Sequence, residues 1–554
     1  MERPLAFSVL AIAVLATPAS GCTLLLDLNA NECEAPTDCT GRGPEFANTT
    51  CSPEGICIPL AATGCTTNQA CTDAFDGAPH ICKNVGDECT PLLSETCPQV
   101  YGDHTDDNAV IIGMGFTLTG PEHKYGERAF LALTLAFEEI RKNANGLPPS
   151  TPGGARRPIV MVACDDGAAL ENAEEIQDKS VKHLIEDVGV PAIFGYSYSD
   201  ITIRLATSFD IPAGVMVLCS HCTSPTLVTM PDNGLVWTAE ANDADMATPL
   251  AAMLEYFEPV VREEQSLEES EPIRVGLVSS DSPAYSPVAD VYDATVKFND
   301  GQSAVENGSN YRRADYPNPI DNPNPDYSAA ATAMLEHKPH IIQFIGNAEV
   351  AAEVMPLIEE GLLPTDPKPH YIFIPDNYPG VNVIDAINAT DMGTGNLYPR
   401  IHGVYKPPAD LPLYDQFKIR YEAAYPGEKM TIQGNHYDAG YAMAYAIAAA
   451  GNVPQLDGTA IASAMSRLVP PGVGIDVGPS KINDAFSALA AGGNIDLQGI
   501  AGNLDWNLQT GIPPGTAGAW CIAPDGAGAL DFSTETGLTY ETGSRKFEGN
   551  YNCQ

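Results

Sequence analysis

The stretch "AVIIGMGFTLTGPEHKYGERAFLALTLAFEEI", residues 109–140, decides the fold of the main body of this chain. It opens with a short, continuous apolar run, which is typical of a strand buried on both faces. A turn follows, and apolar side chains then recur at helical spacing at Phe130, Leu133, Phe137 and Ile140. The stretch therefore predicts a buried strand, a turn and an amphipathic helix.

The same alternation continues along the chain. Apolar runs at 157–164, 190–196 and 213–219 are separated by segments with helical spacing. The pattern restarts at 273–280, after the acidic stretch 261–272, which we interpret as a linker. Strands that alternate with helices predict parallel sheets covered by helices. Two such units predict an α/β protein of two lobes with a cleft between them.

Length and charge narrow the possible functions. The chain has 554 residues, which is more than one hydrophobic core usually supports. Its 28 basic and 72 acidic residues give a net charge of −44. Such a surface repels nucleic acid and anionic membranes, so we exclude nucleic acid as a partner.

The N-terminus predicts export. Residues 1–21 contain one arginine, an apolar run too short to span a membrane, and small residues before a cysteine, as in a signal peptide. "ASGC", residues 19–22, resembles the bacterial lipobox, with Ala19 where leucine is usual. We expect lipidation of Cys22, so that the protein lies in the periplasm or at the cell surface and meets the membrane only through this anchor. The alternative is ordinary secretory cleavage after Ala19 or Gly21.

The cysteine content predicts disulfides, because an exported chain with 15 cysteines lies in an oxidising compartment. Nine cysteines fall between Cys33 and Cys97, which predicts a small disulfide-stapled module or stalk over residues 22–107. Near the C-terminus, we expect Cys521 to pair with Cys553.

"LCSHCTSPTLV", residues 218–228, is open to a redox, a metal or a ligand-binding interpretation. Pro225 fits a loop better than the helix that a redox Cys-x-x-Cys opens. Structural zinc takes four ligands, and Cys219, His221 and Cys222 supply three. We therefore expect a local Cys219–Cys222 bridge in a binding loop, with no metal and no cofactor. The sequence also lacks the common hydrolase and phosphate-loop motifs, so we do not expect an enzyme.

Seven motifs, in order from about residue 108 to near 540, resemble the periplasmic leucine/isoleucine/valine-binding protein family. This family consists of type I solute-binding proteins of ABC importers. Its opening strand, Thr-Gly-Pro turn, Tyr-Gly and helix are similar to residues 111–140. The other motifs are "VACDDGAAL" (162–170), "IFGYSYSDIT" (193–202), "GVMVLCSHCTSPTL" (214–227), "SPAYSPVADVY" (282–292), "HYDAGYAMAYAIAAAG" (436–451) and "GIAGNLDWNLQTG" (499–511).

The resemblance implies the type I periplasmic-binding-protein fold, in which two doubly wound parallel sheets are joined by a hinge. The first lobe would comprise 108–240 and 408–497, and the second 241–407 and 498–554. The family's strand order, 2-1-3-4, would place Cys164 and Cys219 about 14 Å apart, too far for a disulfide. Cys164 would then be free and buried, or bonded to the N-terminal module.

In the first lobe, the resemblance implies four ligand-binding residues. Ser199 would meet a ligand anion after the third strand, and His221 with Thr223 would meet it after the fourth. Tyr125 would form an aromatic wall. Ser199 has an alternative role as a helix cap, and Thr223 and Tyr125 have ordinary turn and packing alternatives.

In the second lobe, Tyr285 falls where the family places its other aromatic wall. Asn347 and Asp376 fall in loops where members place an aromatic residue and an acid that binds an amino group. Asp376 could instead form a turn before Pro379. Because Asp200 and His221 depart from the family pattern, an amide, a peptide or another amino acid is as well supported as a simple aliphatic amino acid.

These features predict a surface-tethered solute-binding protein. It would capture a small polar ligand by hinge closure of two lobes and deliver it to an ABC permease in the membrane. The alternative is an extracellular sensor or adhesion protein of the same fold, in which the cysteine-rich module contacts a partner.

Overall fold

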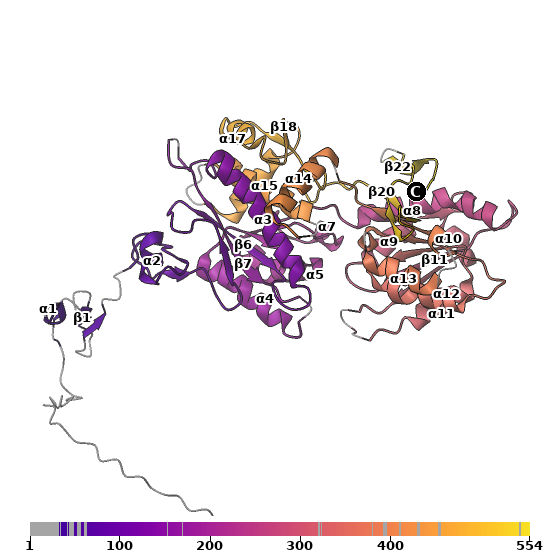
Figure 1. Cartoon of the computed structure of the whole chain (residues 1–554), viewed down its shortest axis with the longest axis horizontal. Helices are drawn as coiled ribbons and strands as arrows, with labels where there is room; N and C mark the ends of the chain where they lie inside the picture. The colour runs from indigo at the N-terminus through magenta and orange to yellow at the C-terminus, as the bar shows by residue number, and fades with distance from the viewer. Residues whose placement is uncertain are drawn as a thin grey trace, which may run out of the picture. The chain divides into compact units, whose positions relative to one another are not determined.

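The computed structural model describes residues 33, 35–40, 42–43, 49–51, 57–59, 64–151, 153–168, 170–319, 322, 324–378, 380–391, 396–408, 411–428, 433–451, 456–541 and 544–553. The predicted signal peptide and the lipidation site Cys22 lie outside these residues. The chain forms two compact units, one of residues 1–64 with 86–88 and the other of 65–85 with 89–554 (Figure 1).

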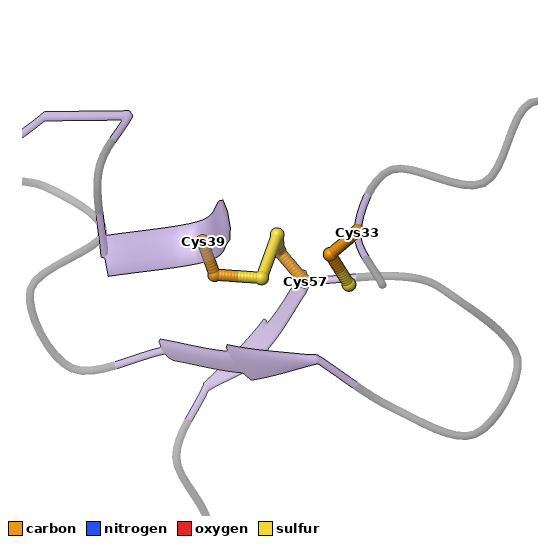
Figure 2. A group of neighbouring side chains, drawn as sticks. All are labelled: Cys33, Cys39 and Cys57. Atoms are coloured by element: carbon orange, nitrogen blue, oxygen red, sulfur yellow. A yellow bond between two sulfur atoms is a disulfide. The ribbon is translucent and has the colours of Figure 1, made fainter. Parts of the chain in front are cut away.

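The smaller unit is held together by two disulfides. It contains a short helix, α1 (Pro36–Thr40), and a hairpin of β1 (Thr49–Cys51) and β2 (Cys57–Pro59). Cys33 is bonded to Cys51, and Cys39 to Cys57. Figure 2 shows the sulfur atoms of Cys33, Cys39 and Cys57 close together. Because each is already bonded to another sulfur, their proximity reflects two adjacent disulfides and no thiolate is left to bind a metal.

A second copy of this arrangement follows in the chain. Cys65 is bonded to Cys82 and Cys71 to Cys89, so that the first and third and the second and fourth cysteines pair, as in the smaller unit. The copy again has a short helix and a two-stranded hairpin: α2 (Asn68–Ala74), β3 (His80–Ile81) and β4 (Thr90–Pro91). The region predicted as one module is thus an internal repeat of two small disulfide-bonded copies.

The second copy packs on the first lobe, which corrects the boundary predicted at residue 108. The Lys83 Nζ donates hydrogen bonds to the carbonyl oxygens of Glu186 and Asp187. Cys97 forms a disulfide with Cys164, so the cysteine of the second predicted strand is bonded to the N-terminal region. The lobe therefore includes residues well before 108.

The first lobe is built on a six-stranded sheet in the order β10-β9-β8-β6-β7-β5. The order β7-β6-β8-β9 is the 2-1-3-4 arrangement expected from the resemblance. All pairs are parallel except that β5, at the edge, runs antiparallel to β7. The strands are β5 (Gln99–Tyr101), β6 (Val110–Phe116), β7 (Ile159–Asp165), β8 (Ala192–Gly195), β9 (Met216–Cys219) and β10 (Val236–Thr238).

Helices cover both faces of this sheet (Figure 1). On one face, Ile112 and Met114 of β6 pack with α3 and α15 in a large apolar core. Gly126 of α3 is required by a close approach, since a Cβ there would lie 2.0 Å from the carbonyl oxygen of Thr117. This contact explains the glycine of the Tyr-Gly in the opening motif. The helices and helical turns are α3 (His123–Ala144), α4 (Ala173–Lys182), η2 (His183–Val188), α5 (Ser199–Leu205), η3 (Ala206–Asp210), α6 (Ile211–Ala213), α7 (Thr226–Thr229), α14 (Leu411–Ala424), α15 (Gln433–Ala450), α16 (Gly458–Ala464), η8 (Met465–Arg467) and α17 (Ile482–Ala490).

The second lobe has a seven-stranded sheet in the order β14-β11-β15-β16-β17-β20-β21. Its first five strands are parallel, and β20 and β21 from the C-terminal segment add an antiparallel edge. A disulfide joins Cys521 of β20 to Cys553. The strands are β11 (Val275–Ser280), β14 (Tyr311–Tyr316), β15 (Ile341–Ile345), β16 (His370–Phe373), β17 (Ile401–Tyr405), β20 (Gly518–Pro524) and β21 (Leu530–Ser533).

Helices pack on this second sheet in the same manner, with two separate apolar cores on its faces. They are α8 (Ala244–Glu264), α9 (Ser286–Thr295), α10 (Ala304–Asn307), η4 (Gly308–Asn310), α11 (Ser328–His337), η5 (Val350–Val354), α12 (Met355–Gly361), η6 (Pro375–Asn377), α13 (Val381–Asp391) and η7 (Tyr398–Arg400). Small two-stranded sheets complete the larger unit: β12 (Lys297–Phe298) with β13 (Gln302–Ser303), β18 (Val473–Asp476) with β19 (Ile495–Gln498), and β22 (Leu538–Glu541) with β23 (Lys546–Gly549).

The chain passes between the lobes three times, after β10, after β17 and before β20. The last crossover lies later than the boundary predicted at 498. Leu504 and Trp506 belong to the core of the first lobe, and the indole N–H of Trp506 donates to the carbonyl oxygen of Thr238. Burial of these side chains keeps the last of the seven motifs, residues 499–511, with the first lobe.

Candidate functional site

A cavity of about 710 Å³ lies where the three crossovers meet. This volume is within the range of small-molecule sites. The first crossover contributes Glu240, the second Lys406 and the third Thr516. The remaining walls come from loops at the carboxyl ends of the parallel strands in both lobes, where ligands bind in doubly wound sheets.

Six of the seven residues predicted to bind ligand line this cavity: Ser199, His221, Thr223, Tyr285, Asn347 and Asp376. Tyr125 does not. It lies in the first turn of α3, and its ring packs behind the wall against Tyr198, with ring centres 6.0 Å apart and an interplanar angle of 17°. Tyr198, which sequence reasoning missed, lines the cavity instead.

The first-lobe wall is two loops tied together by Ser199. The backbone N–H groups of Thr223 and Ser224 donate to the Ser199 Oγ over 3.1 and 3.2 Å. Cys219 and Cys222 are bonded to each other within the second loop. The Cys-x-x-Cys thus staples a cavity wall, and Ser199 connects the loops in addition to opening α5.

A buried aspartate beneath the wall holds three segments together. The Asp166 carboxylate accepts hydrogen bonds from the Thr117 hydroxyl (2.8 Å) and the Ser197 backbone N–H (2.9 Å). Burial raises the pKa of Asp166, and its hydrogen bonds oppose this rise. The Asp-Asp motif at the end of β7, residues 165–166, therefore positions the loops and does not itself line the cavity.

An ion-pair network joins the first two crossovers. The Lys406 Nζ lies 2.9 Å from a carboxylate oxygen of Glu240 and 2.9 Å from one of Asp243. The other Glu240 oxygen accepts from the Asn435 side chain (2.7 Å) and pairs with the His221 Nδ1. Asn435 is neutral, and the other residues of this network carry charge or can acquire it. Their contacts therefore link the first two crossovers electrostatically.

The network shifts the pKa values of its members. Burial lowers the pKa of His221, but the charge and hydrogen bond of Glu240 outweigh burial and leave it raised. Burial raises the pKa of Glu240, and the charges of His221 and Lys406 outweigh this and hold it well below its ordinary value. The pKa of Lys406 is likewise raised by Asp243 and Glu240 against burial. Each of these three shifts favours the charged form of its group.

The second-lobe wall presents acids and a tyrosine. The Tyr285 hydroxyl donates to an Asp376 oxygen over 2.6 Å. Asp376 is exposed to the cavity but surrounded by protein, which raises its pKa to about 7, with a further contribution from the like charge of Asp243. Nearby, Glu349 accepts from the Asn347 backbone N–H over 3.2 Å.

Sequence reasoning missed Glu240, Asp243 and Lys406. A signal was present, because Lys406 directly follows β17 and Glu240 lies two residues after β10, at the ends where the chain crosses between lobes. Their pairing was not visible, since more than 160 residues separate Lys406 from Glu240.

The family model described as "Periplasmic binding protein" matches residues 109–478. The chain belongs to this family. Solved structures of similar fold include a leucine-binding protein, LivK, from Thermotoga maritima (16% identity, TM-score 0.50, covering 77% of this chain and 98% of that one). A type 1 periplasmic binding protein from Bordetella pertussis is also similar (16%, 0.51, 77% and 100%). A third is an R. palustris solute-binding protein in complex with 4-hydroxybenzoate (13%, 0.52, 80% and 98%).

These periplasmic binding proteins share the fold with this chain at low sequence identity. No curated protein sequence matches it. Membership of the family implies an exported protein, which agrees with the seven disulfides of the described residues. None of the helices in the described ranges is both long and apolar enough to cross a membrane.

Proposed function

We propose that this periplasmic binding protein captures a small polar ligand in the cavity at the crossovers and delivers it to an ABC-type importer. The observation that supports the proposal is the cavity itself. It is built from the loops that the sequence singled out in both lobes, at the point where the lobes are connected. Closure of the lobes about the crossovers would bury the ligand between the two walls.

The membrane anchor and the permease belong to the same proposal. Cys22 would carry lipid and tether the protein at the periplasmic or outer surface, and the two small disulfide-bonded copies follow Cys22 in the chain before the lobes. An ABC permease would then receive the ligand from the closed form. Metabolic labelling with a fatty-acid analogue, compared between the full chain and Cys22→Ala, tests the anchor directly.

Thermal unfolding of residues 23–554 tests ligand capture. The panel comprises amino acids, small amides, peptides, amines and aromatic acids. A ligand at 100 times its dissociation constant adds about 2.7 kcal/mol to the free energy of unfolding, which gives a visible shift in the midpoint. If the protein unfolds cooperatively and no compound in the panel shifts its midpoint, the proposal is contradicted.

Two tyrosine variants test whether a ligand found in this panel binds in the cavity. Tyr285→Phe removes the hydroxyl that bonds to Asp376 in the cavity wall and should reduce the ligand-induced shift. Tyr540→Phe removes a hydroxyl from the distant β22 and should leave the shift unchanged. Equal effects of the two variants would place the ligand outside the cavity.

A further inference from the structure

The charged side chains around the cavity are mostly acidic. Five carboxylates line it: Asp200, Glu240, Asp243, Glu349 and Asp376. Two lysines, Lys406 and Lys418, are the ammonium groups among the described lining residues. The formal charge of the wall is therefore −3 with His221 neutral, and it remains negative when His221 is charged.

The ammonium group of Lys406 already donates hydrogen bonds to protein acceptors. Its Nζ donates to Glu240 and Asp243 and to the carbonyl oxygen of Ala241, over 2.9 to 3.0 Å. Three acceptors satisfy the three N–H bonds of an ammonium group. A ligand carboxylate would have to break this network to reach Lys406, and the other ammonium group, Lys418, is exposed on α14.

The backbone N–H groups of the loop expected to meet a ligand anion also have acceptors within the protein. The N–H groups of Thr223 and Ser224 donate to the Ser199 Oγ, and Asp200 places a negative charge at the cavity wall beside them. An anion near Asp200 would be repelled, and it would have to displace Ser199 to find these donors.

The second-lobe wall of the cavity, by contrast, is suited to bind a cation. Asp376 and Glu349 line the cavity here, and neither forms an ion pair with a lysine or arginine among the described residues. Five tyrosines line the same space: Tyr198, Tyr285, Tyr378, Tyr405 and Tyr414. Carboxylates that accept N–H bonds, together with aromatic faces, are the groups that bind a protonated amine with an apolar body.

We propose that the ligand is an organic amine without a carboxylate group, with its ammonium held between Asp376 and Glu349 and its body against the tyrosines. This inference rests on the proposed function, since it takes the cavity as the ligand site. Burial and the like charge of Asp243 raise the pKa of Asp376, and a bound ammonium group would act in the opposite direction.

Isothermal titration of residues 23–554 with two matched sets tests this inference. One set is tyramine, tyrosine and the deaminated acid of tyrosine, and the other is isopentylamine, leucine and the deaminated acid of leucine. We expect an amine to bind at least about tenfold more tightly than its amino acid, and the acids to give no binding. Tighter binding of an amino acid or an acid would overturn the amine assignment and leave capture in the cavity standing.

If none of the six compounds binds, the amine assignment is also overturned. The wider thermal-unfolding panel then tests separately whether the protein captures any ligand. Asp376→Asn should weaken amine binding at least about tenfold, and Glu349→Gln provides a second variant should the first fail to fold. Glu360→Gln, which removes one charge from the exposed face of α12 outside the cavity, is the matched control and should leave the affinity unchanged. Equal affinities of the Asp376, Glu349 and Glu360 variants would overturn the assignment.

Discussion

Lys406 is the residue on which the hinge network depends. Its ammonium separates the carboxylates of Glu240 and Asp243, whose side chains are 13% and 3% exposed. Lys406→Met would leave two nearly buried carboxylates without their main counter-charge. Since removal of one partner of a buried ion pair typically costs about 3 to 5 kcal/mol, we expect a loss near 3 kcal/mol in the free energy of unfolding, measured in urea.

A lysine of the first-lobe surface provides the control. Lys481 pairs with Asp484 at 3.5 Å, and both side chains are largely exposed. Lys481→Met should cost less than about 1 kcal/mol, because exposed pairs contribute little. If both lysine variants unfold at the same urea concentration, the crossover network does not stabilise the protein as we infer.

The pair of His221 and Glu240 predicts a pH dependence. The folded pKa of His221 is raised above its ordinary value of 6.5, so its contribution to stability is complete below that pH and is lost as pH rises through the folded value. The folded pKa of Glu240 is lowered from 4.5, so its contribution is present above 4.5 and is lost as pH falls through the folded value. The pair therefore stabilises most between about pH 4.5 and 6.5.

Urea unfolding of His221→Asn and of the parent protein tests this window. The difference in free energy of unfolding should be larger near about pH 5.5 than near about pH 8.5. His123→Asn, at an exposed histidine at the start of α3, should not show this trend. A His221 difference that grows toward high pH would show that the histidine acts through packing and not through its charge.

Single residues of the site were predictable to different degrees. Ser199 and Thr223 lie shortly after the predicted strands at 190–196 and 213–219, and such positions gather at one edge of a parallel sheet. The family resemblance placed Tyr125 in the cavity wall, but α3 begins at His123 and turns the ring behind Tyr198. The position of the ring depends on helix phase, which a matching motif does not determine.

At the scale of elements, the stapled loop after β9 can be compared with the link between Cys97 and Cys164. The two disulfides close loops of very different length, with sequence separations of 3 and 67. In the chain-entropy description, the long loop contributes about 4 kcal/mol and the short one about 2 kcal/mol. Urea unfolding of Cys97→Ala/Cys164→Ala should show the greater loss.

The short disulfide should matter more for the ligand. Cys219→Ala/Cys222→Ala frees the loop that carries His221 and Thr223, and it should weaken ligand binding more than the Cys97/Cys164 double variant does. If the Cys97/Cys164 double variant weakens binding more, the Cys219–Cys222 disulfide is not what orders the cavity wall.

Elements were predicted better than their ends. The buried strands β6, β8 and β9 lie within the apolar runs that predicted them, and β7 extends one residue beyond its run, to Asp165. Continuous apolar strands bounded by turns are a strong signal. The acidic stretch 261–272 was interpreted as a linker, yet α8 runs to Glu264 and belongs to the second lobe. Local composition did not reveal that apolar residues earlier in α8 anchor the whole helix.

At the scale of the whole molecule, the cysteine-rich region was predicted as one module. Composition identified it, but cysteine spacing alone leaves the connectivity open. The structure divides it into two copies with the same pairing, of which the second, from Cys65, joins the larger unit. The division depends on contacts with the first lobe that lie about 100 residues away in the chain.

This division predicts that two truncations will differ. A chain that begins at Cys65 lacks only the main segment of the smaller unit, so its lobes should unfold at nearly the same temperature as those of residues 23–554. A chain that begins at Gln99 also lacks Cys97 and the copy bonded through Lys83 to the first lobe. Loss of the 67-residue loop closure, worth about 4 kcal/mol, should lower the melting temperature by several degrees.

Calorimetry of the three chains, with circular dichroism to confirm that each is folded, measures the difference. Because the second truncation also frees Cys164, that cysteine is changed to Ala in this chain so that aggregation through a thiol does not add to the effect. If removal of the first copy alone lowers the melting temperature as much as removal of both, the smaller unit stabilises the lobes and is not an independent spacer.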